Sequence, residues 1–242
     1  MTANAVVQAQ FPGSRSSKPI APGLHTVLFI LLFLAMTAGG AFFQHRQKLH
    51  PEILQQHPHV AGLYLSLIVM EWALVFYVWK GLRRTGTSLR EVIGGRWGSA
   101  KDVAVDAALG IGLWGFWLGA QMAWTRWMGE GHSASIGTLL PQRTIEIVLW
   151  VLLSISAGIC EEIVFRGYFQ QQFKVFAGSG LLAVLMQAIL FGISHGYQGV
   201  DATIRIAVFG ALFGLLAMWR KSLRPGMIAH AWTDIFSGIL GI

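Results

Sequence analysis

The stretch 148–173, "VLWVLLSISAGICEEIVFRGYFQQQF", places two adjacent carboxylates and an arginine in one of the most apolar parts of the chain. The three charged residues are Glu161, Glu162 and Arg166. Removing a charge from water is costly, so charges inside such a segment require a structural or a chemical reason. The surroundings of this stretch therefore decide both the fold class and the search for a functional site.

The composition of the whole chain indicates a membrane protein. Its 242 residues are 54% hydrophobic and only 12% charged, whereas an ordinary soluble domain has about 25% charged residues. The net charge of +7 comes from basic residues in short runs beside apolar segments, which is how membrane topology is encoded. We therefore expect a lipid bilayer, and no nucleic acid, as a partner. The single cysteine excludes an internal disulfide.

The chain divides into a polar tail and one membrane domain. Residues 1–22 are small and polar and include prolines, so we expect a disordered cytosolic tail, followed by a single integral membrane domain over 23–242. The apolar run 24–43 is longer than a signal-peptide core, which favours a retained helix. The predicted fold is all-α, a polytopic transmembrane bundle with its motif-bearing core at about 145–240. It has about seven spans, near residues 24–43, 60–79, 103–127, 145–170, 180–196, 202–219 and 225–241.

Basic loops orient this predicted bundle. Loops rich in Lys and Arg face the cytosol, and two such loops follow the second span and precede the last one. The N-terminal tail then lies on the cytosolic side of the cell membrane, or of the cytoplasmic membrane in a bacterium. The loop residues are Lys80, Arg83, Arg84, Arg90, Arg96 and Lys101, and then Arg220, Lys221 and Arg224.

The first unexplained charges are those of the opening stretch. If this segment is helical, Glu162 and Arg166 are four residues apart and share one face, within reach of an ion pair. Glu161 lies about 100° around the helix. We therefore expect a structural ion pair between Glu162 and Arg166, and we expect Glu161 to remain available for chemistry.

The last three segments add further ionisable residues. His195 closes the sequence "FGISH", and His230 and Asp234 are four residues apart in "HAWTD", on one helical face. With Glu161 they offer two carboxylates and two imidazoles. Such a set suits either a zinc ion held by these four residues or a metal-free carboxylate that activates water. For Glu161 and His195 to meet, the helix must continue from about residue 150 to about residue 173.

Two other functions remain open. A non-catalytic scaffold or a transporter also places carboxylates and histidines inside a membrane bundle. The sequence "GISHG" at 192–196 matches G-x-S-x-G, which would make Ser194 the nucleophile of a rhomboid-like serine intramembrane protease. That motif needs a strand-to-helix turn, and here it lies in an apolar, helix-like stretch.

Three motifs occur in order along the apolar segments. Glu161-Glu162-x-x-x-Arg166 reads E-E-x-x-x-R, Phe191-x-x-x-His195 reads F-x-x-x-H, and 230–234 reads H-x-x-x-D. This set resembles the CPBP family of intramembrane proteases, which includes the type II CAAX prenyl endopeptidases and bacteriocin-processing or self-immunity proteins. The resemblance covers about residues 145–240.

The resemblance implies an intramembrane endopeptidase, of metalloprotease or glutamate type. Glu161 and His195 would activate water, with His230 and Asp234 completing the site. The cofactor would be zinc or none, and the substrate a membrane-proximal or lipidated peptide or protein. Endopeptidase members of the family favour Asn at the last position, where this chain has Asp234, so a cation could bind more readily here.

Overall fold

The described residues form helices and no strand. The computed structural model describes residues 18–49, 60–128 and 139–240, and within these ranges the expected all-α fold is confirmed. The tail expected at 1–22 falls mostly outside them. The elements are α2 (Gly23–Leu49), α3 (Ala61–Arg83), α4 (Leu89–Ile93), α5 (Ala100–Met128), α7 (Thr144–Glu161), η2 (Glu162–Phe169), α8 (Gln170–Ala177), α9 (Gly180–Ser194), η3 (Gly196–Gln198), α10 (Val200–Arg220) and α11 (Arg224–Leu240).

Every expected apolar segment contains a helix, but the helices differ in length. Five are long and apolar enough to cross a membrane: 23–43, 61–83, 100–127, 144–177 and 200–220. Helices α9 and α11 have 15 and 17 residues, and at about 1.5 Å per residue both are shorter than a bilayer core of about 30 Å. The chain is therefore an integral membrane bundle of five long helices with two shorter ones packed among them.

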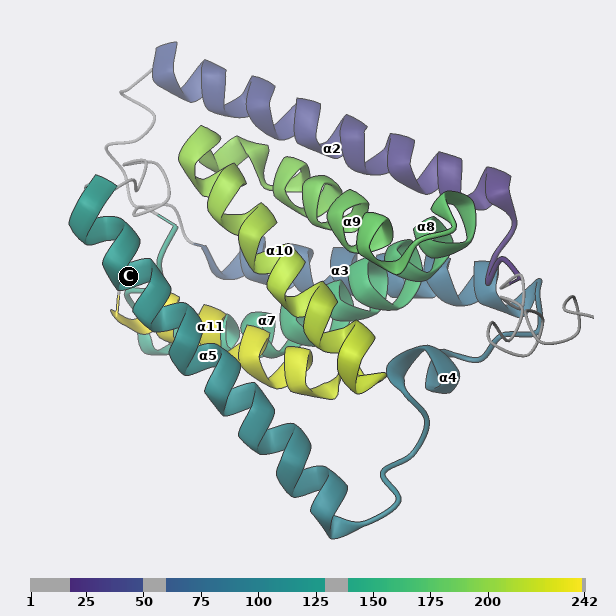
Figure 1. Cartoon of the computed structure of the whole chain (residues 1–242). Coiled ribbons are helices and arrows are strands. Elements are labelled where there is room, and N and C mark those ends of the chain that lie inside the picture. Colours follow the sequence, from purple (N-terminus) through teal and green to yellow (C-terminus); the bar gives the residue numbers. More distant parts are fainter. Residues whose placement is uncertain (1–17, 50–59, 129–138, 241–242) are drawn as a thin grey trace, which may run out of the picture.

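The motif-bearing helix lies at the centre of the bundle. Half of the most apolar window of helix 144–177 is buried inside the protein, against 17–28% for the other four long helices. Helix α7 contacts α3 and α11, and η2 contacts α9 (Figure 1). Helices α9 and α10 lie side by side, and α5 crosses the outer face of α11. The central helix therefore has protein neighbours on several sides and is the most buried of the five long helices.

The two basic loops lie at the same end of the bundle. The backbone N–H of Leu223 donates a hydrogen bond of 3.0 Å to the carbonyl of Ile93, and the guanidinium of Arg224 contacts the carbonyl of Gly95. This contact joins the loop after α3 to the turn before α11. Because both loops are rich in Lys and Arg, they form one strongly basic end, as the positive-inside rule expects for loops on the same side of a membrane.

Small residues allow the helices to approach closely around the motif. A Cβ atom at Gly158 of α7 would lie 2.7 Å from the backbone nitrogen of Ala231 in α11. A Cβ at Gly214 of α10 would lie 2.6 Å from the side-chain nitrogen of Gln187 in α9. The glycines in these apolar segments therefore serve close helix–helix contact, as small residues often do in membrane proteins.

We predict that Gly158→Ala destabilises the bundle. The added methyl group meets backbone atoms of α11, which cannot move aside as a flexible side chain would, and such overpacking costs about 1–3 kcal/mol. The matched control is Gly115→Ala in α5, where a Cβ has nothing within 4 Å. Thermal unfolding in detergent should show a lower Tm for Gly158→Ala alone, and an equal Tm in the two variants would contradict the proposed close contact.

Candidate active site

The first motif lies on a continuous helix that changes its winding. Helix α7 ends at Glu161, and a π-helical segment, η2, begins at Glu162 and continues into α8. The expected continuation of the helix through the motif is therefore confirmed, although it begins at Thr144 rather than near 150. The π-helical winding was not expected from the sequence. Such segments are rare and occur frequently at functional sites.

The predicted ion pair is present and fully buried. Nη1 of Arg166 lies 3.0 Å from Oε1 of Glu162, and neither side chain has any exposed surface. The guanidinium also lies 4.4 Å from the ring centre of Phe191 and 5.6 Å from that of Phe213. A desolvated cation over aromatic faces gains about 2 kcal/mol. The charge of Arg166 is therefore balanced by one carboxylate and by aromatic rings from α9 and α10.

His230 of α11 lies between the acidic side chains. Its Nδ1 is 3.0 Å from Oε1 of Glu162, the same oxygen that pairs with Arg166. Its Nε2 is 3.7 Å from Oε2 of Glu161 and 3.6 Å from Oδ2 of Asp234. With both nitrogens protonated, His230 donates from Nδ1 to Glu162 and directs its Nε2–H toward the other two carboxylates. Glu162 therefore fixes the imidazole orientation in addition to pairing with Arg166.

The acidic residues of this cluster differ in their access to solvent or substrate. The side chains of Glu161 and Asp234 are 22% and 33% exposed, whereas that of Glu162 is 0% exposed. Glu162 is thus sealed inside the protein, and Glu161 and Asp234 reach the surface of the site. This difference separates a structural carboxylate from two that an incoming molecule can touch.

His195 lies at the end of α9 rather than inside it. Helix α9 ends at Ser194, two residues before the end of the predicted segment 180–196, and Nδ1 of His195 is 2.9 Å from the carbonyl of Phe191. The ring of Phe191 packs against both imidazoles, with centroids 4.8 Å from His195 and 6.1 Å from His230. Within the described ranges, no hydrogen bond or ion pair joins His195 to Glu161, His230 or Asp234. The structure therefore brings His230 into contact with Glu161 and Asp234. It separates His195 from them, with the ring of Phe191 packed against both imidazoles.

The residues do not form a ready-made metal site. A structural or catalytic zinc ion needs three or four ligands that converge on one point at about 2.0–2.3 Å. In the part of the chain that the structure describes, no group of three or more His, Cys, Asp or Glu side chains has that arrangement. The four residues expected to bind zinc therefore do not fit the ion as they stand, and we derive no reaction step through a metal.

A further carboxylate outside the three motifs borders the cluster. Glu71 of α3 is buried, and it is close enough to interact electrostatically with Glu161, His230 and Asp234. The sequence contains a signal for it, because Glu71 is the single acidic residue of the apolar segment 60–79. An ionisable residue inside a membrane segment is a candidate for function by default.

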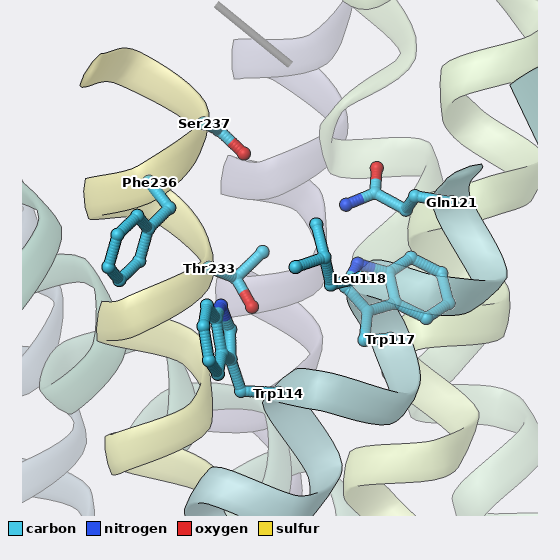
Figure 2. A pocket seen from close by; sticks show the side chains of 7 residues that line it. All are labelled: Trp114, Trp117, Leu118, Gln121, Thr233, Phe236 and Ser237. Carbon is cyan, nitrogen blue, oxygen red and sulfur yellow. The ribbon is translucent and has the colours of Figure 1, made fainter. Parts of the chain in front are cut away.

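A small hollow lies between α5 and α11, beside the third motif. Figure 2 shows Trp114, Trp117, Leu118 and Gln121 of α5 facing Thr233, Phe236 and Ser237 of α11. Three aromatic, three polar and one aliphatic side chain line the hollow. None of the predicted site residues lines it, so it is separate from the charged cluster.

We predict that Arg166→Met strongly destabilises the protein. The substitution leaves the carboxylate of Glu162 buried without its cation, which costs about 3–5 kcal/mol. Replacing both partners, as in Glu162→Leu with Arg166→Met, removes the uncompensated charge and should recover most of that loss. Unfolding measured for the two variants in detergent distinguishes this from a simple loss of side-chain volume, in which the double variant would be the less stable one.

Comparison with known families agrees with the three motifs. Residues 143–236 match the model of the family described as Type II CAAX prenyl endopeptidase Rce1-like. The matched segment begins directly before α7 and ends within α11, so it includes all three motifs and leaves α2, α3 and α5 outside. No curated protein and no solved structure matched the chain. The resemblance expected from the motifs is thus confirmed: residues 143–236 match the model of this CAAX-type protease family.

Proposed function

We propose that this protein is an endopeptidase that uses Glu161 to activate water for hydrolysis of a peptide bond at the membrane. The observation that supports this most is the contact of His230 of α11 with Glu161 and Asp234, where α11 packs against the most buried of the five long helices. A carboxylate that is partly exposed, and beside an imidazole, can both receive and return a proton.

The proposed reaction follows from these groups. Glu161 accepts a proton from water as the water oxygen attacks the carbonyl carbon of the scissile bond. The resulting oxyanion is stabilised by a donor N–H from His195 or His230. Glu161 then returns its proton to the leaving nitrogen, and the C–N bond breaks. Glu162 and Arg166 take no proton in this scheme, and they hold His230 in place.

The substrate is expected to be a membrane-proximal or lipidated peptide or protein. The site lies among apolar helices, so a substrate anchored in the bilayer reaches it without leaving the membrane. We further propose that the basic end of the bundle faces the cytosol, following the positive-inside rule. The N-terminal tail would then also be cytosolic.

The serine-protease alternative is less well supported. The hydroxyl of Ser194 donates a hydrogen bond of 2.7 Å to the carbonyl of Phe191 and lies 3.1 Å from Nδ1 of His195. Ser194 is the last residue of α9, so the strand-to-helix turn that exposes such a nucleophile is not present at this position. A transporter or scaffold that uses the same cluster differs from the protease in a simple way, because it would leave every peptide substrate intact.

We predict that Glu161→Gln lowers kcat by about 10²–10⁴-fold, the usual contribution of a general base. His195→Ala should also abolish measurable cleavage, whereas Ser194→Ala should retain it. The measurement is cleavage of a lipidated, membrane-anchored peptide by purified protein in vesicles. Full activity in Glu161→Gln would reject the assignment, and loss of activity confined to Ser194→Ala would favour the serine mechanism.

We also predict that chelation leaves this cleavage largely unchanged, since the described residues offer no converged ligand set. Metal content of the purified protein, measured beside activity before and after chelator treatment, tests the expectation. Loss of activity that added zinc restores would instead indicate a metalloprotease with a rearranged site.

A further inference from the structure

Glu71 lies on the face of α3 that packs against the motif-bearing helix. The buried side chains of α3 recur at helical spacing, and Glu71 falls among Tyr64, Val75, Val78 and Leu82. That stripe faces α7 and η2. Only 8% of Glu71 is exposed, so its carboxyl group is enclosed between α3 and the helix that bears Glu161.

The surroundings of Glu71 contain several acids and no permanent cation. The groups that act on its carboxyl are Ser156 and Glu161 of α7 and His230 and Asp234 of α11. In the part of the chain described, Oε2 of Glu71 has no hydrogen-bond partner, and the same is true of Oε2 of Glu161. The carboxyl groups of Glu71 and Glu161 therefore each present one buried oxygen without a hydrogen-bond partner in the same region of the bundle.

Such an arrangement is unfavourable if it serves only the fold. Ser156 hydrogen-bonds to the carboxyl group of Glu71, but a buried carboxyl oxygen that has no hydrogen-bond partner, such as its Oε2, loses its hydration and gains nothing in return. An apolar side chain of similar size would fill the same place in the stripe between Tyr64 and Val75 at lower free energy. The position of Glu71 is instead well suited to a small polar molecule that donates two hydrogen bonds, and water is such a molecule.

We propose that Glu71 is the second carboxyl of the proteolytic centre, and that Glu71 and Glu161 together bind the attacking water. This rests on the proposed function. One hydrogen of the water is transferred to Glu161, and the other remains hydrogen-bonded to Glu71, so a lone pair of the oxygen is directed at the carbonyl carbon. Glu71 gains and loses no proton during the step. The water-binding pair thus joins a residue of the matched segment 143–236 to one outside it.

The test compares Glu71→Met, which has similar length and no group able to hold the water, with Glu71→Gln, which keeps one acceptor oxygen. We expect kcat to fall by about 10- to 100-fold in Glu71→Met, the effect of losing a hydrogen bond to a charged group, and by less in Glu71→Gln. KM should change little. The Tm of both variants should equal or exceed that of the wild type, because an unsatisfied buried carboxyl has been removed.

The matched control is Glu146→Gln, which alters another buried glutamate on α7. Glu146 caps the start of that helix through the backbone N–H groups of Gln142 and Arg143, so this variant should have a lower Tm and a kcat within about twofold of wild type. If Glu71 has only a structural role, Glu71→Gln should likewise lower the Tm and leave kcat within about twofold of wild type. That result would overturn the proposal. A kcat within about twofold of wild type in Glu71→Met would also overturn it. If Glu71→Met does not fold, Glu71→Gln decides by the same twofold limit.

The outcome for Glu71 is separable from that for the proposed function. If the wild type cleaves the anchored peptide and Glu161→Gln does not, the protease assignment holds and the Glu71 variants alone decide this inference. If the wild type leaves the peptide intact, the protease assignment fails, and the water-binding role of Glu71 fails with it.

Discussion

The buried ion pair between Glu162 and Arg166 is the constraint on which the site depends. Two charges removed from water are tolerated only if each remains paired. Here Glu162 and Arg166 pair with each other on η2, and the further groups that contact them come from other helices. Arg166 lies against the rings of Phe191 and Phe213, from α9 and α10, and Glu162 also holds His230 of α11. One pair on the central helix therefore fixes the positions of three further helices. A shift of any of them would leave a charge uncompensated.

Adjacent glutamates in one helix can serve opposite purposes because successive side chains point in different directions. Glu162 faces inward and is sealed, while Glu161 faces His230 and remains partly exposed. The histidine contacts both of them through its two nitrogens. His230 thus links the buried Glu162–Arg166 pair to Glu161, the residue to which we assign the proton transfer. The same residues that stabilise the contact between η2 and α11, Glu162 and His230, therefore also separate the structural role of Glu162 from the proposed chemical role of Glu161.

Sequence reasoning predicts the parts of this site that depend on local spacing. The four-residue intervals of Glu162–Arg166 and His230–Asp234 correctly place each pair on one helical face, and apolar length predicts the helices. It does not predict the π-helical winding at Glu162, because the spacing of apolar residues carries no signal for such a segment. It also places His195 inside α9, whereas the chain turns there. Glu71 is visible as a lone acid in an apolar segment, but its orientation toward α7 depends on how α3 packs.

The position of Glu71 has a consequence for how the domain and the rest of the chain cooperate. The matched segment supplies Glu161, His230 and Asp234, and these already place three polar groups in contact. Without α3, that cluster would face lipid on the α7 side, where no hydrogen-bonding partner for water exists. Helix α3 closes this side and contributes a carboxyl in place of a purely apolar wall. In the proposed mechanism, a water molecule between α3 and α7 has acceptors on both helices, so α3 belongs to the site and does not merely anchor it.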